Sequence, residues 1–362
     1  MFDNAFLNRK VLITGNTGFK GSWLSIWLLE LGAEVFGYAL PPERNDDNFV
    51  SSKLQNKIHH FDGDVRDFDT LNKVVKNIEP DIIFHLAAQP LVVKSYDDPY
   101  ETYSTNIMGV VNILEVARKN SKVKVLINVT SDKCYHNNNW VWGYRENDKM
   151  GGNDPYSASK GSSEIITQSY IKSFFSKEGT TNVASVRAGN VIGAGDWAEN
   201  RIIPDYFRSL KNKQMLLIRN PYSTRPWQHV LEPLSGYLVL ACKLLDNSKE
   251  YQGGWNFGPL DSKNYSVQEL IDHISKKSNY FNSKIENDSS KVHEAKFLQL
   301  DISKAKSLLH WSPILDFEKT IEFTVHGYLS DIMKNPCFEN RIETVNNYVK
   351  LAKEVNAMWA AK

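Results

Sequence analysis

The sequence predicts a doubly wound α/β fold, in which helices cover both faces of a parallel sheet and a smaller mixed α/β region is attached. Apolar runs rich in β-branched residues alternate with helical patterns along the first half of the chain, which is typical of βαβ units. These runs are continuously apolar, as in strands that are buried on both faces. At 362 residues, the chain is long enough for two regions with their own cores.

The individual elements follow from these patterns. Runs with the composition of buried strands lie at residues 10–14, 34–40, 81–88 and 124–130. Segments with apolar residues at helical spacing lie at residues 19–31, 71–78, 106–119 and 157–175. The second half changes to mixed helices and short strands. We therefore predict one domain over residues 1–188 and about 225–257, and a second over about 189–224 and 258–362.

Composition excludes several classes of function. The chain carries 43 Lys and Arg against 42 Asp and Glu, so it lacks the basic field that recruits nucleic acid or an anionic membrane. Its most apolar early stretch, residues 23–31, is too short to span a membrane and contains Glu30. Cys134, Cys242 and Cys337 are too few and too scattered for a disulfide framework or a zinc cluster. We expect a cytoplasmic protein without a metal site and without a nucleic-acid or membrane partner.

The turn between the first strand and the first helix reads TGNTGFKG and spaces Gly15, Gly18 and Gly21 three residues apart. Glycines there allow a tight turn, and the backbone N–H groups at the helix N-terminus attract a pyrophosphate. The motif predicts a dinucleotide site of the Rossmann type. The structural alternative is a turn that only needs positive φ.

The acid that usually contacts the ribose 2′-OH, about 20 residues further on, is missing, because the second strand ends at Leu40 without one. Spacing alone therefore does not choose NAD over NADP, and Lys20 or Arg44 would suit a 2′-phosphate. Asp64 follows a short run that resembles a strand. It either meets an adenine or belongs to an Asp-rich turn.

Two groups of residues have the chemistry of a catalytic site. Tyr156 and Lys160 are four residues apart on a helical segment, so their side chains share one face. A nearby cation would lower the pKa of Tyr156 towards that of a general base, although two unconnected exposed residues are the alternative. An earlier strand ends in Ser131, Asp132 and Lys133, at the sheet edge where ligands bind.

Taken in this order, the motifs resemble those of the extended short-chain dehydrogenase/reductase family. They are TGNTGFKG at 14–21, HLAAQ at 85–89, TNIMGVVNILEVA at 105–117, Ser131, YSASK at 156–160, RAGNVIG at 187–193, STRPWQHV at 223–230, WNFGP at 255–259 and LDISKAKSLLHWSP at 300–313. They cover nearly the whole chain. Within the family, Ser131 followed by Asp132 is similar to the triplet of nucleotide-sugar 4,6-dehydratases. The third residue of that triplet is usually Glu, whereas this chain has Lys133.

The resemblance implies an NAD-dependent cycle of oxidation at C4, loss of water across C5 and C6, and reduction at C6. Tyr156 would take the C4 hydroxyl proton with help from Lys160 and Ser131, and Asp132 would protonate the leaving C6 hydroxyl. The C5 base is open between Lys133 and Asp132, because a lysine starts near pKa ~10.4 and acts only when neutral. The implied cofactor-binding residues are Gly15, Asn16, Thr17, Gly18, Phe19, Lys20, Gly21, Asp64, Val65, Leu86, Ala87, Ala88, Gln89, Asn106, Tyr156 and Lys160.

The resemblance further implies that the substrate is a nucleotide sugar, CDP-glucose, although no residue identifies the cytosine directly. Guanidinium geometry suits its diphosphate, and Arg225 matches the family's diphosphate arginine best. The candidate substrate-binding residues are Gln89, Arg187, Asn190, Arg201, Arg208, Arg225 and Asn256. For Arg201 and Arg208 the alternative is a surface arginine. His85 is interpreted as a structural histidine, and Trp140 and Trp142 as packing residues.

Two other functions stay open. An epimerase or reductase of the same family would need Tyr156 and Lys160 but would not use Asp132 as an acid. A non-catalytic cofactor-binding sensor would use the same fold. The helices at 106–119 and 157–175 have apolar faces that relatives use for a two-fold four-helix interface, so we expect a homo-oligomer. The sequence does not choose between a dimer and a tetramer.

Overall fold

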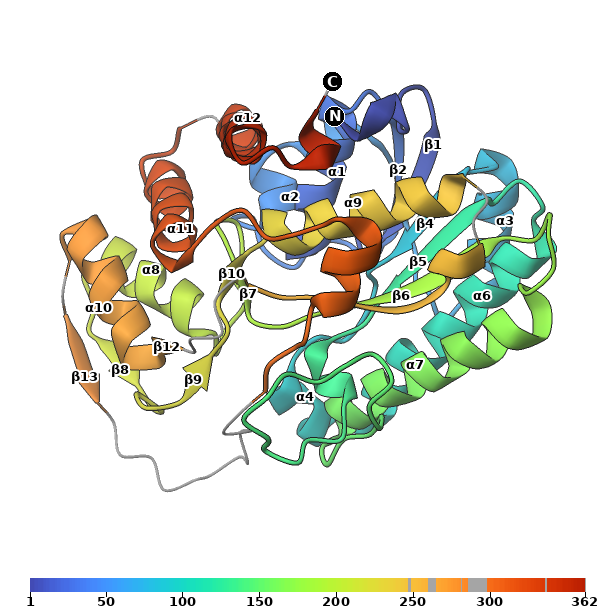
Figure 1. Ribbon diagram of the computed structural model, residues 1–362. Helices are drawn as coiled ribbons and strands as arrows, with labels where there is room; N and C mark the ends of the chain where they lie inside the picture. Colours follow the sequence, from blue (N-terminus) through green and yellow to red (C-terminus); the bar gives the residue numbers. More distant parts are fainter. Residues whose placement is uncertain (247–248, 260–264, 281, 286–297, 336, 362) are drawn as a thin grey trace.

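A sheet of seven strands forms the centre of the molecule (Figure 1). The structure, a computed structural model, describes residues 1–246, 249–259, 265–280, 282–285, 298–335 and 337–361. The strands pair in parallel in the order β11-β6-β5-β4-β1-β2-β3. Their bounds are Lys10–Thr14 for β1, Glu34–Ala39 for β2, His59–Asp62 for β3, Ile82–His85 for β4, Val125–Val129 for β5, Asn182–Ala188 for β6 and Gly253–Phe257 for β11. The predicted doubly wound α/β fold is confirmed.

Both faces of the sheet are buried, which explains why the strands are continuously apolar. Successive side chains of a strand point to opposite faces. Along β1, Val11 and Ile13 pack in one hydrophobic cluster and Leu12 packs in another. On β4, Phe84 belongs to the first cluster and Ile83 to the second. The central strands therefore contribute apolar side chains to two separate cores, whereas the edge strand β3 is largely exposed.

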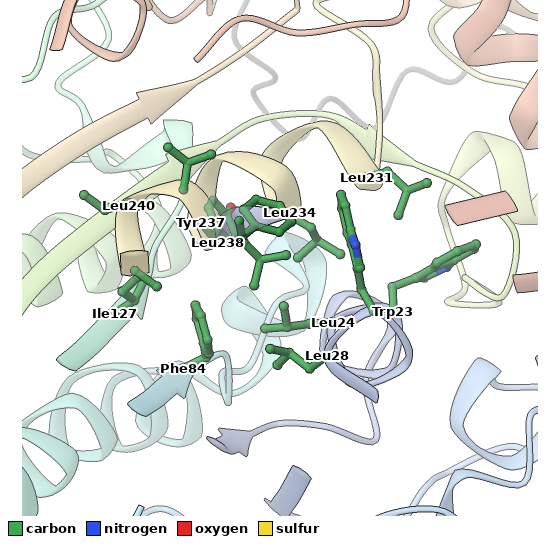
Figure 2. Close-up of a cluster of buried hydrophobic side chains, with 14 of the residues drawn as sticks. Trp23, Leu24, Leu28, Phe84, Ile127, Leu231, Leu234, Tyr237, Leu238 and Leu240 are labelled. Carbon is green, nitrogen blue, oxygen red and sulfur yellow. The ribbon is translucent and has the colours of Figure 1, made fainter. Parts of the chain in front are cut away.

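Helices complete the two cores. The first cluster lies between the sheet and α1 (Phe19–Glu30) and α9 (Leu231–Leu245). Figure 2 shows Trp23, Leu24 and Leu28 of α1, Leu231, Leu234 and Leu238 of α9, and Phe84 and Ile127 of the sheet in this cluster. The second cluster lies under α3 (Phe68–Ile78), α6 (Gly109–Lys119) and α7 (Pro155–Phe174). The sheet is thus covered on both sides.

Local sequence explains where α7 begins. The carboxylate of Asp154 accepts a hydrogen bond from the N–H of Ser157, and Pro155 occupies the first turn, where its missing N–H costs nothing. The predicted start at residue 157 is therefore two residues late. The predicted helix at 106–119 differs more, because a π-helical turn, η3 (Ser104–Met108), precedes α6. Val65 packs so closely on Gly109 that a Cβ there would lie 2.9 Å from its Cγ2.

A smaller region lies beside the carboxyl ends of the strands, on the left in Figure 1. It contains α8 (Ile202–Asn212), α10 (Val267–Ser278) and α11 (Phe317–Ile332). Three two-stranded sheets belong to it or border it: β7 (Val191–Ile192) with β10 (Gln228–His229), β8 (Leu216–Ile218) with β13 (Ser283–Ile285), and β9 (Thr224–Arg225) with β12 (Tyr265–Ser266). Its helices share a third hydrophobic cluster, which includes Phe207, Leu270, Ile321 and Tyr328.

The C-terminal third divides between the two regions, whereas we predicted all of residues 258–362 in the second. Helix α12 (Cys337–Glu354) packs on α1, where Tyr348 lies 5.7 Å from Trp27 between ring centroids. Trp359 stacks on Phe2 at 5.0 Å, so the two termini lie side by side (Figure 1). Trp311 also belongs to the first cluster. These large aromatic side chains therefore bury their apolar surface in the first cluster, beside α1 and α9.

The remaining helical segments are short. They are α2 (Asn48–Ser51), α4 (Val92–Asp97), α5 (Pro99–Tyr103), η1 (Phe2–Asn4), η2 (Leu54–Asn56), η4 (Asp132–Cys134), η5 (Lys249–Tyr251), η6 (Ala305–Leu309) and η7 (Met358–Ala360). Among the helices of the described ranges, none is both long and apolar enough to cross a membrane.

Candidate active site

The polar motifs gather where the parallel strands end. Strands β1, β4, β5 and β6 are neighbours in the sheet, so the segments that follow them lie at one edge, where ligands of such sheets bind. These segments are residues 15–18, 86–89, 130–134 and 189–190. Helices α1 and α7 have their N-termini at the same edge.

The glycine turn after β1 has the backbone geometry of a dinucleotide cradle. Gly15 has a φ of 74° and donates its N–H to the carbonyl of Tyr38. A Cβ on Gly15 would lie 2.7 Å from the nitrogen of Ala87, and one on Gly21 would lie 2.2 Å from the carbonyl oxygen of Gly15. Gly18 is the N-cap of α1, and no side chain caps it. The N–H groups of the first turn are therefore available to a pyrophosphate, and the turn fits the group.

Side chains of the turn attach it to its neighbours. The Asn16 amide donates to Nδ1 of His60 at 3.0 Å, and the Thr17 hydroxyl donates to the carbonyl of Leu40 at 3.1 Å. Phe19 packs partly buried against the first hydrophobic cluster. These three residues thus position the turn, while its backbone faces the ligand.

The opposite wall is the segment after β4. Leu86, Ala87 and Ala88 are partly exposed there. Asn106 is buried and clamps Gln89, because its Oδ1 accepts from the Gln89 N–H at 2.8 Å and its amide donates to the Gln89 carbonyl at 3.1 Å. The same amide donates to Ser159 of α7 at 2.9 Å. The buried amide of Gln89 itself bonds to residues 91 and 102, so both side chains position this wall.

His85 and Asp64 are engaged within the protein. Nδ1 of His85 lies 2.7 Å from the Thr14 hydroxyl, and burial, followed by the charge of Lys160, lowers the pKa of His85 to about 3. A neutral buried histidine agrees with its interpretation as structural. Asp64 accepts from the Arg66 guanidinium at 2.8 Å and from its N–H at 2.8 Å, which is the geometry of the turn alternative. Val65, beside it, is buried.

We call residues 131–134 the acid–base turn. Ser131 is the N-cap of the short helix η4, and its hydroxyl accepts from the Lys133 N–H at 3.2 Å. The same hydroxyl donates to Asp132 Oδ1 at 2.9 Å. Because it has a single proton, Ser131 serves either Asp132 or a phenolate of Tyr156. Asp132 is buried and Lys133 is partly exposed, so the acid lies deeper than the base.

The environment of Asp132 favours its protonated form. Burial raises the pKa of this carboxyl, and Lys133, the Ser131 hydroxyl, Lys20 and Arg225 oppose that rise without cancelling it. Space for the carboxylate comes from Gly189, where a Cβ would lie 2.1 Å from Asp132 Oδ2. We did not single out Gly189 from the sequence, although it stands in the RAGNVIG motif. Its glycine is explained by this close approach.

Tyr156 and Lys160 lie at the same site, but their pKa values differ from our expectation. Burial raises the pKa of Tyr156 to about 12, although the Ser131 hydrogen bond lowers it. We predicted a phenol with a lowered pKa beside Lys160; instead burial dominates, and Arg201 is the cation that lowers it. The Lys160 ammonium donates to the Val129 carbonyl at 3.4 Å.

Lys20, from the glycine turn, adds a further positive charge. Burial lowers the pKa of Lys20 to about 8, Asp132 opposes this shift, and Lys160 and Arg201 add to it. The charges of Asp132 and Lys160 thus both influence the pKa of Lys20, so the three residues form one electrostatic group.

The candidate substrate-binding residues fall into two sets. Arg225 lies near enough to Asp132 to affect its pKa, and Arg201 pairs with Asp196 at 2.8 Å while acting on Tyr156. Asn190 is partly exposed in the left-handed conformation. Arg208 is held by the carbonyls of residues 197 and 198 and by Asp205. It therefore has its hydrogen bonds within α8 and the loop before it.

Arg187 and Asn256 are not placed as ligand-binding residues. Arg187 is 1 % exposed and pairs with Glu164 at 2.8 Å. Asn256 is fully buried, and its amide donates to the carbonyls of Tyr144 and Asp301 at 2.8 and 3.1 Å. We therefore withdraw both from the diphosphate and sugar, because each side chain is buried and makes its hydrogen bonds within the protein.

The chain is similar to known proteins over most of its length. Residues 12–324 match the protein-family model described as GDP-mannose 4,6 dehydratase. The chain is 48% identical over 322 residues to the CDP-glucose 4,6-dehydratase of Salmonella typhimurium (strain LT2), with 88% of this chain and 90% of the relative covered. At 23% identity over 349 residues it matches a dTDP-glucose 4,6-dehydratase of the same organism, with 89% and 93% covered.

A solved structure has the same fold. The dTDP-glucose 4,6-dehydratase of Bacillus anthracis, in complex with NAD, superimposes with a TM-score of 0.75 at 20% identity, with 91% of this chain and 99% of that chain covered. The likeness of the backbone agrees with the sheet order described above.

Replacing Lys160 by Met should stabilise the cofactor-free protein. Burial lowers the Lys160 pKa from 10.5 to about 8, so the unfolded chain binds more protons between these values and the free energy of unfolding rises with pH there. The cost of the buried cation is full below pH 8. We expect the variant to be more stable at pH 7 by about 2–3 kcal/mol and the difference to vanish near pH 10.5, as measured by urea unfolding. The exposed Lys306→Met is the control; equal stability of the Lys160 variant and wild type at pH 7 would contradict the cost of burial.

Proposed function

The chain belongs to the GDP-mannose 4,6-dehydratase family, as the resemblance of its motifs predicted, and on that premise we propose that it dehydrates CDP-glucose. The product would be CDP-4-dehydro-6-deoxy-glucose, and the cofactor NAD. The relative with 48% identity over 88% of this chain supports the substrate. The observation that carries the reaction is the buried Asp132, a carboxyl with a raised pKa beside Ser131 and Tyr156.

The glycine turn would hold the cofactor. Gly15 and Gly21 allow the turn to pack closely on its neighbours, and the uncapped N-terminus of α1 at Gly18 would bind the pyrophosphate. Arg44, which we considered for a 2′-phosphate, pairs with Asp46 at 3.3 Å and with Glu199 at 3.2 Å. This pairing favours NAD over NADP, because both carboxylates would repel the additional phosphate. When bound, NAD supplies the reversible oxidation that no side chain can perform.

Three residues would act on the C4 hydroxyl. Tyr156 takes its proton, and Ser131 donates a hydrogen bond to the phenolate that forms. Lys160, whose ammonium lies at the Val129 carbonyl at the end of β5, would add a positive charge to the site. A phenol with a pKa of about 12 is a weak base in the cofactor-free protein. The Ser131 hydrogen bond and the charge of Arg201, which both lower this pKa, would favour its ionised form.

Asp132 would deliver the proton that lets the C6 hydroxyl leave as water. An acid must still hold its proton near neutral pH to do so, and burial of Asp132 raises its pKa in that direction. A ketone at C4 acidifies the hydrogen at C5. Lys133 either removes that proton or stabilises the enolate, and the alternative is that Asp132 performs both transfers.

An arginine and an asparagine remain as direct ligands of the nucleotide sugar. Arg225 would bind the diphosphate, since its charge reaches the acid–base turn and a guanidinium forms two parallel hydrogen bonds with phosphate oxygens. Asn190 would contact the sugar from the segment after β6. Arg201 would support the phenolate of Tyr156 instead of the diphosphate.

We further propose that the protein forms a homo-oligomer through α5, α6 and α7. Large apolar side chains are exposed on or next to these helices, namely Tyr100 at 83 %, Ile165 at 60 %, Met108 at 49 % and Phe174 at 46 %. Single exposed apolar residues are ordinary, but a gathered set marks an interface. A second copy, related by a two-fold axis, would cover the same residues on both chains.

The substrate assay tests the proposed function. With NAD and solvent deuterium, the protein should convert CDP-glucose in preference to dTDP-, UDP- and GDP-glucose, and the 4-keto-6-deoxy product should carry deuterium at C5. Tyr156→Phe should lose about 100- to 10,000-fold in turnover. An inverted sugar without C5 deuterium would favour an epimerase, and cofactor binding without turnover of any sugar would favour a sensor.

Two substitutions separate the candidates for the C5 base. If Lys133 is the base, Lys133→Met should lower C5 exchange by about 100-fold or more, whereas Asp132→Asn should keep exchange and lose water elimination. If Asp132 performs both transfers, Asp132→Asn alone should abolish exchange. Proton exchange measured by NMR on the same samples decides, with Lys306→Met as the control. Exchange at the wild-type rate in Lys133→Met would remove Lys133 from the mechanism.

Sedimentation velocity tests the oligomer. Ile165→Asp places a charge in the proposed interface and should shift the protein to a smaller species, because an unpaired buried charge is costly. Val355→Asp, which changes a residue that is 60 % exposed beyond α12, should leave the assembly unchanged. The mass of the wild-type oligomer would distinguish a dimer from a tetramer, whereas a monomeric wild-type protein would contradict the interface.

A further inference from the structure

Glu164 and Arg187 form an ion pair in the interior, next to the candidate active site. The two residues are each 1 % exposed and lie on α7 and β6. Arg187 donates from Nε to Glu164 Oε1 at 2.9 Å and from Nη2 to Oε2 at 2.8 Å. On β11, a Cβ on Gly254 would lie 2.2 Å from Arg187 Nη2. The sheet is thus built to admit this guanidinium.

The pair is attached to both ends of the acid–base turn. On the side before Ser131, the Thr130 hydroxyl donates to Glu164 Oε1. On the side after Cys134, Arg187 Nη1 donates to the hydroxyl of Tyr135. The acid–base turn is therefore attached to one ion pair at both of its ends, through Thr130 before it and Tyr135 after it.

The pair is also part of the helix that carries the other catalytic groups. Glu164 lies one turn after Lys160 on α7. The carboxylate and the ammonium are therefore on the same face of the helix, so a movement of that face displaces both groups. Gly161, between them, contacts the turn directly: a Cβ there would lie 3.1 Å from the Cys134 carbonyl oxygen. Helix α7 and the acid–base turn thus have a fixed separation.

A second layer of contacts fixes Tyr135 from the other side. Its hydroxyl donates to Asn256 Oδ1 at 2.8 Å, and its ring stacks on Tyr144 at 5.2 Å between centroids. The Asn256 amide ties this group to the carbonyls of Tyr144 and Asp301. The anchor after the turn is therefore as firmly held as the anchor before it.

We propose that the Glu164–Arg187 pair is a positioning device, which sets the acid–base turn at the correct distance from Tyr156 and Lys160. Neither residue touches the substrate. The inference rests on the proposed dehydratase function. In that reaction, the pair would set the distance between the groups that act at C4, Tyr156 and Lys160, and the groups that act at C5 and C6, Asp132 and Lys133.

The energetics favour this role over a role in stability alone. Burying two charges costs several kcal/mol, and apolar residues of the same volume often stabilise a protein as well or better. Here every acceptor of Glu164 is used, by Arg187, Thr130 and Ser185. A fully bonded network of this kind holds a single arrangement, which a site with several proton transfers requires.

Each anchor can be removed without replacing either residue of the ion pair. Thr130→Val removes the anchor before the turn, and Tyr135→Phe removes the anchor after it. A displacement of about 1 Å costs on the order of 100-fold in rate, so we expect each variant to lose about that factor in kcat with KM unchanged. The rate of C5 deuterium exchange should fall with it. Thr130→Ser keeps the hydroxyl and should restore the wild-type rate.

Matched controls separate positioning from stability. Tyr348→Phe removes a buried hydroxyl that donates to Glu232 at 2.9 Å, far from the turn, and Thr324→Val removes one bonded to the Thr320 carbonyl at 2.8 Å. Both should lower the unfolding temperature as much as the test variants do and leave kcat unchanged. If Tyr135→Phe fails to fold, Thr130→Val against Thr130→Ser decides.

The outcomes distinguish the two proposals. The positioning role would be overturned if the wild-type protein is active and folded Thr130→Val and Tyr135→Phe have the same kcat. The proposed function would then remain intact. An equal loss of kcat in the controls would also overturn it, because the effect would then follow stability. Absence of turnover of any nucleotide sugar by the wild-type protein would overturn both proposals.

Discussion

Parallel pairing of β1, β4, β5 and β6 is the constraint on which the candidate active site depends. Parallel strands end at the same edge of a sheet, so the segments after these four strands meet although they are far apart in the sequence. The sheet is buried on both faces by α1 and α9 on one side and by α3, α6 and α7 on the other. This double burial gives the edge a rigid base, and the polar groups at its end are held by backbone that cannot move independently.

At this edge, burial and charge act in opposite directions on the same groups. Asp132 is surrounded by Lys133, Lys20 and Arg225, yet burial raises its pKa. The same burial lowers the pKa values of Lys20 and Lys160. Lysines that lose their proton more easily and an acid that keeps its proton suit the proposed reaction. In that reaction protons leave the C4 hydroxyl and C5, and a proton is added to the C6 hydroxyl. The proposed dehydration thus depends on one buried carboxyl, that of Asp132, which an epimerase would not need as an acid.

The interior of the site is polar as well as its surface. Glu164 and Arg187 are ionised groups within the sheet-helix layer, and Asn106 and Gln89 form a second buried set of hydrogen bonds beside them. Such networks cost solvation energy and do not contribute much net stability. Their benefit is a defined arrangement, because any displacement leaves a buried donor or acceptor without a partner. Burial of apolar surface in the hydrophobic clusters is the main stabilising contribution, and the aromatic packing of α12 and the chain termini on α1 belongs to it.

The sequence by itself predicted the doubly wound α/β class, four of the seven strands of the sheet, and the glycine turn. These features are local, since a β-branched run before Gly15 or a Tyr and a Lys four residues apart carries its own signal. The sequence did not indicate that Arg187 pairs with Glu164, which is 23 residues away. It also did not indicate that the Asn256 amide bonds the carbonyls of Tyr144 and Asp301, which are 112 and 45 positions away. It also placed α12 in the wrong region, and it missed Gly189.

Only the tertiary structure decided these points, for one physical reason. The role of a polar side chain is set by the partners and the degree of burial that folding gives it, and both arise between distant segments. An arginine in a motif can bind a diphosphate or neutralise a carboxylate. A tyrosine beside a lysine can have its pKa lowered by charge or raised by burial. The residue type states which chemistry is available, and the packed environment selects the one that occurs.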